Sequence, residues 1–329
     1  MMKMRSTLSI FAILLSACNS LVRAASTPTE SPTQLPPSPT AAPTHTPTIT
    51  PSPEPSAIPT PTWVVQGPGH VLTPILMYHH VEVSPIDSFL RVPAYKFEDE
   101  IRLLRDWEYT PISTTLLVDA ITTGVALPPR PVIITFDDAN EDTYTTAFPI
   151  MQKYGFTGVL YLPFDYIGAP GYMTVDQIKQ MVAAGWEVGS HSLTHPNLST
   201  LDEPKLRDEI VNSRKRLSAL LGIPVLTFAY PFGDVSTAAV DYVRFAGYLA
   251  AMDAKGFTAD QGMGNLFALQ REEIRAAEDA KTFIRFLPWQ GSAAFLPTDT
   301  PTPTLRPTRT PLPTYTQYPT KTAKLSPTP

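Results

Sequence analysis

The chain has 329 residues, a formal net charge of −5 and 37 prolines. No basic cluster stands out between the proline-rich tracts, which argues against nucleic acid as a partner. The one cysteine, Cys18, excludes an intramolecular disulfide and any zinc site built from cysteines. Twelve prolines fall in Pro28–Pro61 and nine in Pro297–Pro329. The stretch between these tracts is long enough for one large domain with a single core.

A short apolar run near the N-terminus predicts export from the cytoplasm. Two basic residues precede Leu8–Leu15, which is too short to span a bilayer and is typical of a signal peptide. Leu15–Cys18 reads L-S-A-C and resembles the lipobox of bacterial lipoproteins, in which the cysteine carries the lipid. Residues 1–18 are therefore predicted to be a lipoprotein signal peptide, lipidated at Cys18. The alternative is an ordinary secretory signal that is cleaved near Ala24–Ala25.

Two segments rich in proline and threonine flank the expected domain. Residues 19–66 and 296–329 contain few large apolar side chains, so neither segment can bury enough surface to fold. At about 3.1 Å per residue in polyproline geometry, the first segment would form a stalk on the order of 100 Å long. We expect a disordered stalk, a folded domain at 67–295 and a disordered tail.

Within that domain, short apolar runs alternate with amphipathic segments, a pattern typical of βα units. Strands are expected at Pro74–Val81, Val132–Asp138, Thr157–Leu162, Glu187–Ser190, Val225–Tyr230, Tyr248–Met252 and Leu266–Gln270. Helices are expected at Tyr95–Trp107, Thr114–Thr123, Pro149–Tyr154, Thr174–Ala184, Leu201–Leu221, Val240–Phe245 and Lys281–Leu287. The alternation predicts an α/β fold built as a (β/α) barrel, complete or incomplete. An open doubly wound sheet is the alternative.

The strand Val132–Asp138 reads V-I-I-T-F-D-D and runs straight into two carboxylates, Asp137 and Asp138. A continuous apolar run suits a strand that is buried on both faces, as in a parallel sheet. Such a strand delivers the residues at its end to the rim where α/β enzymes keep their chemistry. Adjacent carboxylates repel each other, so a cation between them is expected. Taken alone, the pair would equally suit a solvated turn.

Two histidine pairs, His79–His80 and His191–His195, also follow expected strands and would meet Asp137 and Asp138 on one rim. The spacing of four between His191 and His195 would place both imidazoles on one side of a helical turn. Two histidines and one aspartate form a ligand set that leaves room for water on a metal ion. Taken alone, the histidine spacing is also compatible with a hydrogen-bonded loop.

Three motifs occur in order: T-F-D-D at Thr135–Asp138, G-S-H-S-L-T-H at Gly189–His195 and F-A-Y-P-F-G at Phe228–Gly233. Together they resemble the motifs of the NodB-type polysaccharide deacetylases (carbohydrate esterase family 4). The resemblance implies a deformed (β/α)7 barrel that removes N- or O-acetyl groups from polysaccharides. It also implies a divalent metal cofactor, for which zinc is the expected ion although the ligand set would accept others.

Matched to the family, Asp138, His191 and His195 correspond to the metal ligands and Asp137 to the general base. A metal-bound water would attack the acetamide while Asp137 takes its proton. The third motif corresponds to the oxyanion and substrate position, with the backbone N–H at Phe232 and with Tyr230 beside it.

Two departures from the family pattern are visible. Ala229 occupies the position of an arginine that normally pairs with the base, and no histidine after the second motif could act as the usual acid. The opening M-Y-H-H-V at Met77–Val81 resembles a subgroup similar to poly-N-acetylglucosamine deacetylases, whose first strand supplies the acid. His79 matches that acid. Arg271 matches an arginine of the subgroup, which would replace the missing charge beside Asp137.

The expected function is removal of acetyl groups from N-acetylglucosamine-type residues of a cell-wall or extracellular polysaccharide. We expect a monomer outside the cytoplasm, held to the membrane by a lipid anchor or, alternatively, secreted. A catalytically silent glycan-binding module is the second hypothesis, favoured by Ala229 and the missing late histidine but opposed by the intact base and ligand set. A non-haem iron oxygenase would share the two-histidine, one-carboxylate set, but the βα alternation argues against it. Peptidoglycan, poly-N-acetylglucosamine, chitin oligomers and acetylated xylan all remain open as substrates.

Overall fold

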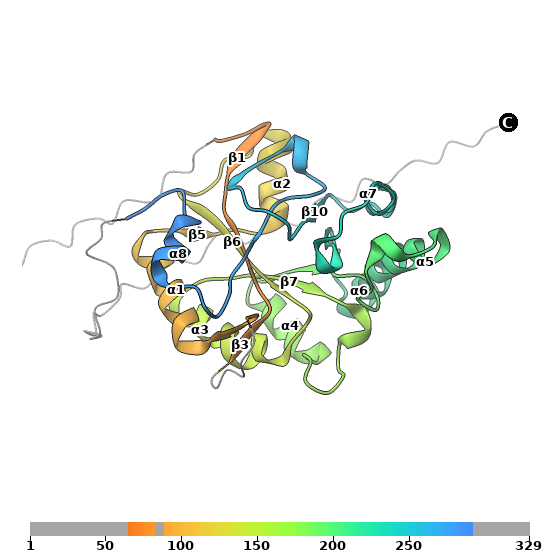
Figure 1. Ribbon diagram of the computed structural model, residues 1–329, viewed down its shortest axis with the longest axis horizontal. Coiled ribbons are helices and arrows are strands. Elements are labelled where there is room, and N and C mark those ends of the chain that lie inside the picture. The colour runs from red at the N-terminus through yellow and green to blue at the C-terminus, as the bar shows by residue number, and fades with distance from the viewer. Residues whose placement is uncertain (1–64, 83–88, 292–329) are drawn as a thin grey trace, which may run out of the picture. The chain divides into compact units, whose positions relative to one another are not determined.

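The computed structural model describes residues 65–82 and 89–291 (Figure 1). The predicted lipidation site at Cys18 and nearly all of the two Pro/Thr-rich segments lie outside these ranges, so their predictions stay predictions. Within the described ranges, no helix combines the length and the apolarity needed to cross a bilayer.

Parallel strands form the central sheet in the order β10-β9-β8-β7-β6-β2-β12, with β5 beside β6. The strands are β1 (His70–Leu72), β2 (Ile75–Tyr78), β3 (His80–Glu82), β4 (Arg91–Pro93), β5 (Thr110–Pro111), β6 (Pro131–Asp137), β7 (Val159–Leu162), β8 (Glu187–Ser190), β9 (Thr227–Ala229), β10 (Ala250–Met252), β11 (Asp260–Gly262) and β12 (Glu272–Glu273). The two end strands of the sheet, β10 and β12, are connected through the short stretch of chain from Leu269 to β12. Leu269 forms a parallel bridge with Met252 of β10, and β12 pairs with β2. The predicted (β/α)7 barrel is therefore confirmed, and the open sheet was wrong.

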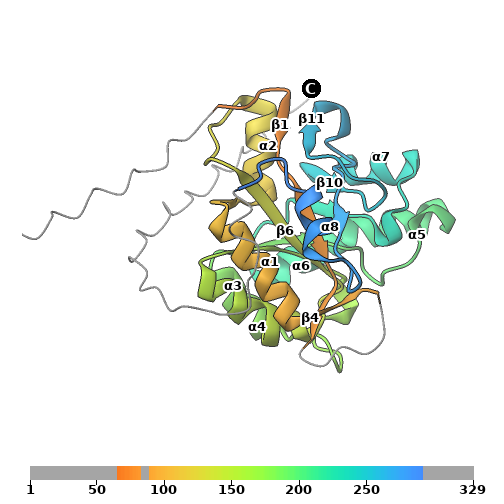
Figure 2. The ribbon, with the colours of Figure 1, turned by 60° about the vertical axis from the view of Figure 1, so that its left-hand side comes forward.

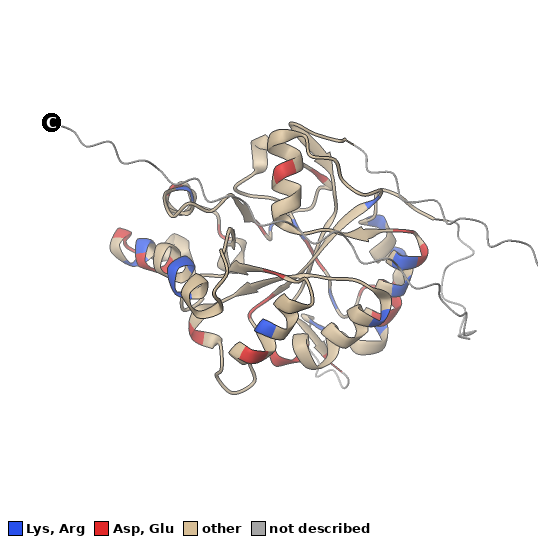
Figure 3. Ribbon diagram, turned by 180° about the vertical axis from the view of Figure 1, so that it is seen from behind, with Lys and Arg blue, Asp and Glu red and all other residues tan. Residues whose placement is uncertain are grey.

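Helices alternate with the strands. Most of them pack on the outer face of the barrel, whereas the apolar side chains of α2 join the core inside it. They are α1 (Ala94–Asp106), α2 (Thr114–Thr123), α3 (Phe148–Tyr154), α4 (Val175–Ala183), α5 (Glu203–Arg207), α6 (Ser213–Leu221), α7 (Thr237–Phe245) and α8 (Ala280–Arg285). Short 3₁₀ turns occur at η2 (Phe164–Tyr166), η3 (Leu198–Thr200), η5 (Pro231–Gly233) and η6 (Met263–Asn265), and π turns at η1 (Thr143–Ala147) and η4 (Asp208–Asn212). Lysine or arginine and acidic residues are interspersed along the outer helices (Figure 3).

The strand β6 runs through the centre of the domain and is buried along its whole length (Figures 1 and 2). Because side chains alternate along a strand, its residues divide between two cores. Val132, Ile134 and Phe136 belong to the core between the sheet and the helices, where Phe136 packs against Trp186 of the chain before β8. Ile133 belongs to the core inside the barrel. Asp137 is four residues after Ile133, so its side chain lies on the same inward face of the strand.

Local sequence signals explain several helix ends. Thr174 and Gln177 form a capping box at the start of α4, which satisfies backbone N–H groups that the helix leaves free. Gly222 ends α6 in the left-handed conformation, which costs glycine little because it has no Cβ. The predicted helix Leu201–Leu221 is present as one helical run from Glu203 to Leu221, with the π turn η4 between α5 and α6.

Three local predictions were wrong. Pro74–Val81 is not one strand, because the chain breaks at His79 and β3 leaves the sheet to pair with β4. The expected strand Leu266–Gln270 makes only the bridge at Leu269, and the strand itself follows as β12. Residues 191–195 form a loop rather than a helical turn, with Ser192 and His195 at positive φ angles of 69° and 59°.

Candidate active site

Both carboxylates of the first motif, T-F-D-D, lie at the carboxyl end of β6. Asp137 ends the strand on its inward face and is 2% exposed. Asp138 and Ala139 then adopt positive φ angles of 73° and 62°, which are costly for residues with a Cβ. Two contacts hold this turn: the Met173 N–H donates to Ala139 at 2.8 Å, and Nδ2 of Asn140 donates to the carbonyl of His79 at 2.9 Å. The strained turn directs the two carboxylates to separate environments.

Asp137 is paired with Arg271 inside the barrel. The guanidinium donates from two nitrogens to the two carboxylate oxygens, each at 2.7 Å. Burial by itself would raise the pKa of Asp137, but the Arg271 charge, with His191 close by, holds this pKa below its usual range. Asp137 is therefore ionised at neutral pH, and its oxygens have a fixed orientation.

Arg271 is itself fixed on every side. Its Nε donates to the Asp253 carbonyl at 3.0 Å, and one terminal nitrogen also donates to Oγ1 of Thr135 at 3.2 Å. The guanidinium lies 5.3 Å from the ring centre of Tyr161, and that ring fits only because residue 189 is glycine, where a Cβ would come within 2.3 Å of it. Burial opposes the charge on Arg271, but Asp137 raises its pKa further above the usual range.

Three potential metal ligands converge beside this pair. Nε2 of His195 lies 3.2 Å from Nε2 of His191 and 3.2 Å from Oδ1 of Asp138, and Nε2 of His191 lies 3.7 Å from the same oxygen. Ligands bonded to zinc at ~2.0–2.2 Å in tetrahedral geometry would be separated by ~3.3–3.6 Å. The three measured separations lie within about 0.1 Å of this range, so the atoms are spaced closely enough to share one ion.

The hydrogen bonds around these atoms also fit a metal. Oδ1 of Asp138 is buried and has no hydrogen-bond partner among the described residues, although Nε2 of His195 is close. Nδ1 of His191 lies 2.8 Å from the Ala229 carbonyl. A carbonyl can only accept, so Nδ1 carries the proton and the Nε2 lone pair of neutral His191 faces Asp138. Burial lowers the pKa of His191 to about 4, which favours this neutral form.

His79, the residue predicted as the acid, lies within electrostatic reach of the two carboxylates. His79 follows β2 and is partly buried, and it is close enough to help lower the pKa of Asp137 and of Asp138. Its Nδ1 is buried without a hydrogen-bond partner in the described part of the chain. The adjacent His80 points elsewhere, since its Nδ1 lies 2.6 Å from Asp142.

Phe232 and Tyr230, the two candidate site residues of the third motif, lie in different environments. Phe232 is 60% exposed, at a positive φ of 60°, and its ring centre lies 4.8 Å from that of His195. The Tyr230 side chain is fully buried and its hydroxyl donates to the Phe267 carbonyl at 3.0 Å. The Tyr230 side chain is therefore a core residue and does not reach the rim as a substrate contact would.

Sequence reasoning missed two residues of the site. Asn140 ties the turn after β6 to His79, and its position directly after the two aspartates could have suggested a turn residue. Glu209 is a buried carboxylate that accepts hydrogen bonds from the loop between His191 and His195. Glu209 carried no sequence signal, because acidic residues are common on the polar face of a helix.

A second group of potential ligands, His80, Glu82 and Asp142, lies at the edge of β3. The side chains of this group are already paired within the protein, since His80 contacts Asp142 and Glu82 pairs with Arg91. The group is therefore a weaker candidate for a metal site than Asp138, His191 and His195.

Comparisons with known proteins agree with this geometry. Residues 124–251 match the family model described as polysaccharide deacetylase. YxkH of Bacillus subtilis (strain 168), whose name also carries the words polysaccharide deacetylase, is 27% identical over 213 residues, 64% of this chain and 74% of its own. The poly-beta-1,6-N-acetyl-D-glucosamine N-deacetylase of Staphylococcus aureus (strain MRSA252) is 28% identical over 147 residues, 40% of this chain and 51% of its own.

Among solved structures, the Streptococcus pyogenes deacetylase PplD in complex with acetate has a similar fold. The TM-score is 0.61 at 22% identity, and the match covers 69% of this chain and 99% of that one. The fold is thus that of the NodB-type barrel. The family match at residues 124–251 and these relatives support an amide-acting hydrolase that is similar to the polysaccharide deacetylases.

Proposed function

We propose that the protein is a metal-dependent deacetylase that removes acetyl groups from N-acetylglucosamine-type residues of an extracellular or cell-wall polysaccharide. One observation carries the proposal. An ionised, immobilised carboxylate, Asp137, lies directly beside three converging ligand atoms of Asp138, His191 and His195. A hydrolase needs these two elements side by side, one to move a proton and the other to hold an ion.

Asp138, His191 and His195 would hold a divalent cation and leave further coordination positions open, and zinc suits this ligand set. When bound, the cation would supply Lewis acidity, which acidifies water and polarises the acetyl carbonyl. Asp138 would then have its charge offset by the cation, while that of Asp137 is offset by Arg271.

Asp137 would accept the proton of the attacking water, because it is ionised and both its oxygens are oriented by Arg271. The oxygen of that water forms a bond to the acetyl carbon, and the carbonyl oxygen becomes negatively charged. The backbone N–H of Phe232 is the proposed donor to this oxyanion.

His79 is the proposed acid for the second half of the reaction. The bond between the carbonyl carbon and the sugar nitrogen breaks, and the amine leaves with a proton from His79. The proton that Asp137 gains offsets the one that His79 gives. The acetic acid loses its remaining acidic proton to solvent, so the products are acetate and a free amine. The proximity of His79 to both carboxylates supports this role. Arg271 beside Asp137 also removes one of the two reasons to expect a silent glycan-binding module, the alanine at position 229.

The substrate class and the location follow from relatives and from the N-terminal sequence. Two relatives, from Staphylococcus aureus and Escherichia coli, are named as N-deacetylases of poly-beta-1,6-N-acetyl-D-glucosamine, and this chain spans 51% and 34% of their lengths. We propose an extracytoplasmic monomer that is anchored through a lipid on Cys18. Detergent-phase partitioning of the expressed protein, lost in Cys18→Ala, would support the anchor; unchanged partitioning would remove it.

Acetate release tests the proposal. Wild-type protein is incubated with β-1,6- and β-1,4-linked N-acetylglucosamine oligomers and with acetylated xylan, in the presence of chelator and after the addition of Zn²⁺. We expect release from an N-acetylglucosamine oligomer that stops with chelator and returns with the ion. Sedimentation with a glycan without acetate release from any of them would instead favour the binding module.

A further inference from the structure

The loop between His191 and His195 carries two of the three proposed metal ligands, yet its own sequence does not fix its shape. It is neither helix nor strand, and two of its residues, Ser192 and His195, have positive φ angles although neither is glycine. Such a conformation persists only where surrounding contacts impose it. One contact is internal, since the His195 N–H donates to Oγ of Ser192 at 2.9 Å.

The carbonyl side of the loop is held by the chain that follows β7. The Phe164 N–H donates to the Ser192 carbonyl at 3.1 Å, and the Asp165 N–H donates to the Leu193 carbonyl at 2.9 Å. These bonds fix one edge of the loop. The opposite edge presents N–H groups, which need acceptors when they are buried.

A single carboxylate, Glu209, supplies those acceptors. One of its oxygens accepts from the N–H groups of Leu193 and Thr194 at 2.8 and 2.9 Å, and the other accepts from the Thr194 hydroxyl at 2.7 Å. Glu209 is 9% exposed. Hydrogen bonds to a carboxylate acceptor are roughly twice as strong as those between neutral groups.

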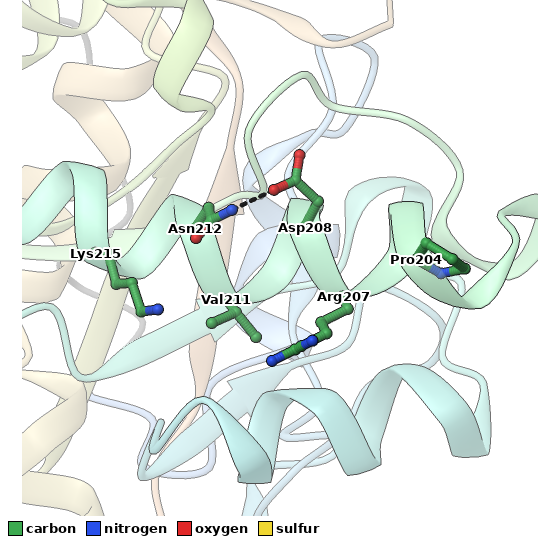
Figure 4. Close-up of a pocket in the computed structure, with 6 residues that line it drawn as sticks. All are labelled: Pro204, Arg207, Asp208, Val211, Asn212 and Lys215. Carbon is green, nitrogen blue, oxygen red and sulfur yellow. Dashed lines mark hydrogen bonds between the residues drawn. The ribbon is translucent and has the colours of Figure 1, made fainter.

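The backbone of the π turn η4 presents Glu209 to the loop. Three consecutive residues of η4, Glu209, Ile210 and Val211, are buried. π turns of this kind often mark functional sites. The neighbouring Asp208 instead bonds with Asn212, beside a shallow outer pocket (Figure 4).

We propose that Glu209 is a positioning residue for the cation site: it clamps the loop so that the Nε2 atoms of His191 and His195 face one point. The inference rests on the proposed cation site and adds a residue that touches neither the ion nor the substrate. Removal of the carboxylate frees one edge of the loop, and the two imidazoles lose their common direction.

The test measures cation binding rather than turnover. Full-length protein is stripped with chelator and titrated with Co²⁺, whose visible absorption reports both the dissociation constant and the coordination geometry. The variants are Glu209→Ala, Glu209→Gln and, as a matched control, Asp208→Asn, which also removes one negative charge from η4. Melting temperatures in chelator give the stability of each metal-free fold.

For Glu209→Ala we expect a Co²⁺ dissociation constant raised about 10- to 100-fold and an altered absorption band. Glu209→Gln can still accept from both N–H groups, so it should recover much of the affinity while remaining weaker than wild type. Asp208→Asn should bind as the wild type does. A purely structural role would lower the melting temperature and leave the dissociation constant and the absorption band of the folded protein unchanged.

Wild-type affinity in Glu209→Ala, or an equal loss in Asp208→Asn, would overturn the proposal. Should Glu209→Ala not fold, Glu209→Gln and Thr194→Val take its place: weaker binding in both supports the clamp, and unchanged binding in both overturns it. Failure of the wild type to bind Co²⁺ would overturn the cation site and the clamp together. Binding by the wild type without acetate release would overturn only the proposed function.

Discussion

Replacement of Arg271 by methionine would leave Asp137 as a buried carboxylate without its countercharge. Methionine fills a similar volume, so the change removes charge and hydrogen bonds more than packing. Two bonds of 2.7 Å to Asp137 are lost, together with those to the Asp253 carbonyl and the Thr135 hydroxyl. The guanidinium is about 1% exposed, so solvent does not screen the loss.

Breaking a buried pair by removing one partner costs about 3–5 kcal/mol. For a domain of this size, roughly 2–4 °C of melting temperature corresponds to 1 kcal/mol, so Arg271→Met should melt about 6–20 °C below wild type. Asp137→Asn leaves the opposite charge unpaired and should also destabilise. The double variant removes both charges, and we expect a coupling free energy of roughly 2–3 kcal/mol between the two positions.

Urea unfolding at neutral pH measures these free energies. Arg102→Met is the control, because Arg102 pairs with Asp99 on the partly exposed face of α1 and should cost less than about 1 kcal/mol. The reasoning is refuted if Arg271→Met destabilises no more than Arg102→Met, or if the free energies of the two single variants at 271 and 137 simply add.

Three further predictions concern pH, the cation and the core. Burial raises the pKa of Glu100 to about 7, so the folded state holds a proton that the unfolded chain loses above about pH 4.5, and stability falls as pH rises across this window. Glu100→Gln should remove this part of the pH dependence and be more stable than wild type at pH 8 by an amount on the order of 3 kcal/mol. Urea unfolding between pH 5 and pH 8 measures this. The prediction is contradicted if the free energy of unfolding changes with pH equally in the variant and the wild type. Chelator should lower the wild-type melting temperature, and Zn²⁺ at 100 times its dissociation constant should restore about 2.7 kcal/mol, whereas an unchanged melting curve would speak against a bound ion. Phe136→Ala should cost about 3–5 kcal/mol, since Phe136 packs against Tyr78, Phe97 and Trp186, and a loss below 1 kcal/mol would contradict this packing.

Local signals were enough for much of the fold. The helix at Thr114–Thr123 has the bounds that the sequence predicts, because Ser113 caps its start and Gly124 ends it. The apolar run before Asp137 identified the buried central strand. Each of these features depends on neighbours within a few residues, which the sequence displays directly.

The predictions that were wrong depended on contacts between distant segments. The four-residue spacing of His191 and His195 suits a helical turn. The segment forms a loop instead, held by a hydrogen bond from the Phe164 N–H and by hydrogen bonds that Glu209 accepts. The burial of the Tyr230 side chain likewise depends on a distant contact, because its hydroxyl donates to the carbonyl of Phe267. Glu209 could not be singled out at all, because its role depends on a loop that lies 15 residues away in the chain.

The central claim is that two adjacent carboxylates perform separate tasks, Asp138 as a metal ligand and Asp137 as the base. Acetate release by Asp137→Asn, measured together with its metal content, tests this claim most directly. Asp176→Asn, an exposed change on α4, serves as the control. Asp137→Asn should lose about 10²–10⁴-fold in acetate release at wild-type metal content. Undiminished release from this variant would contradict the role of Asp137 as the base.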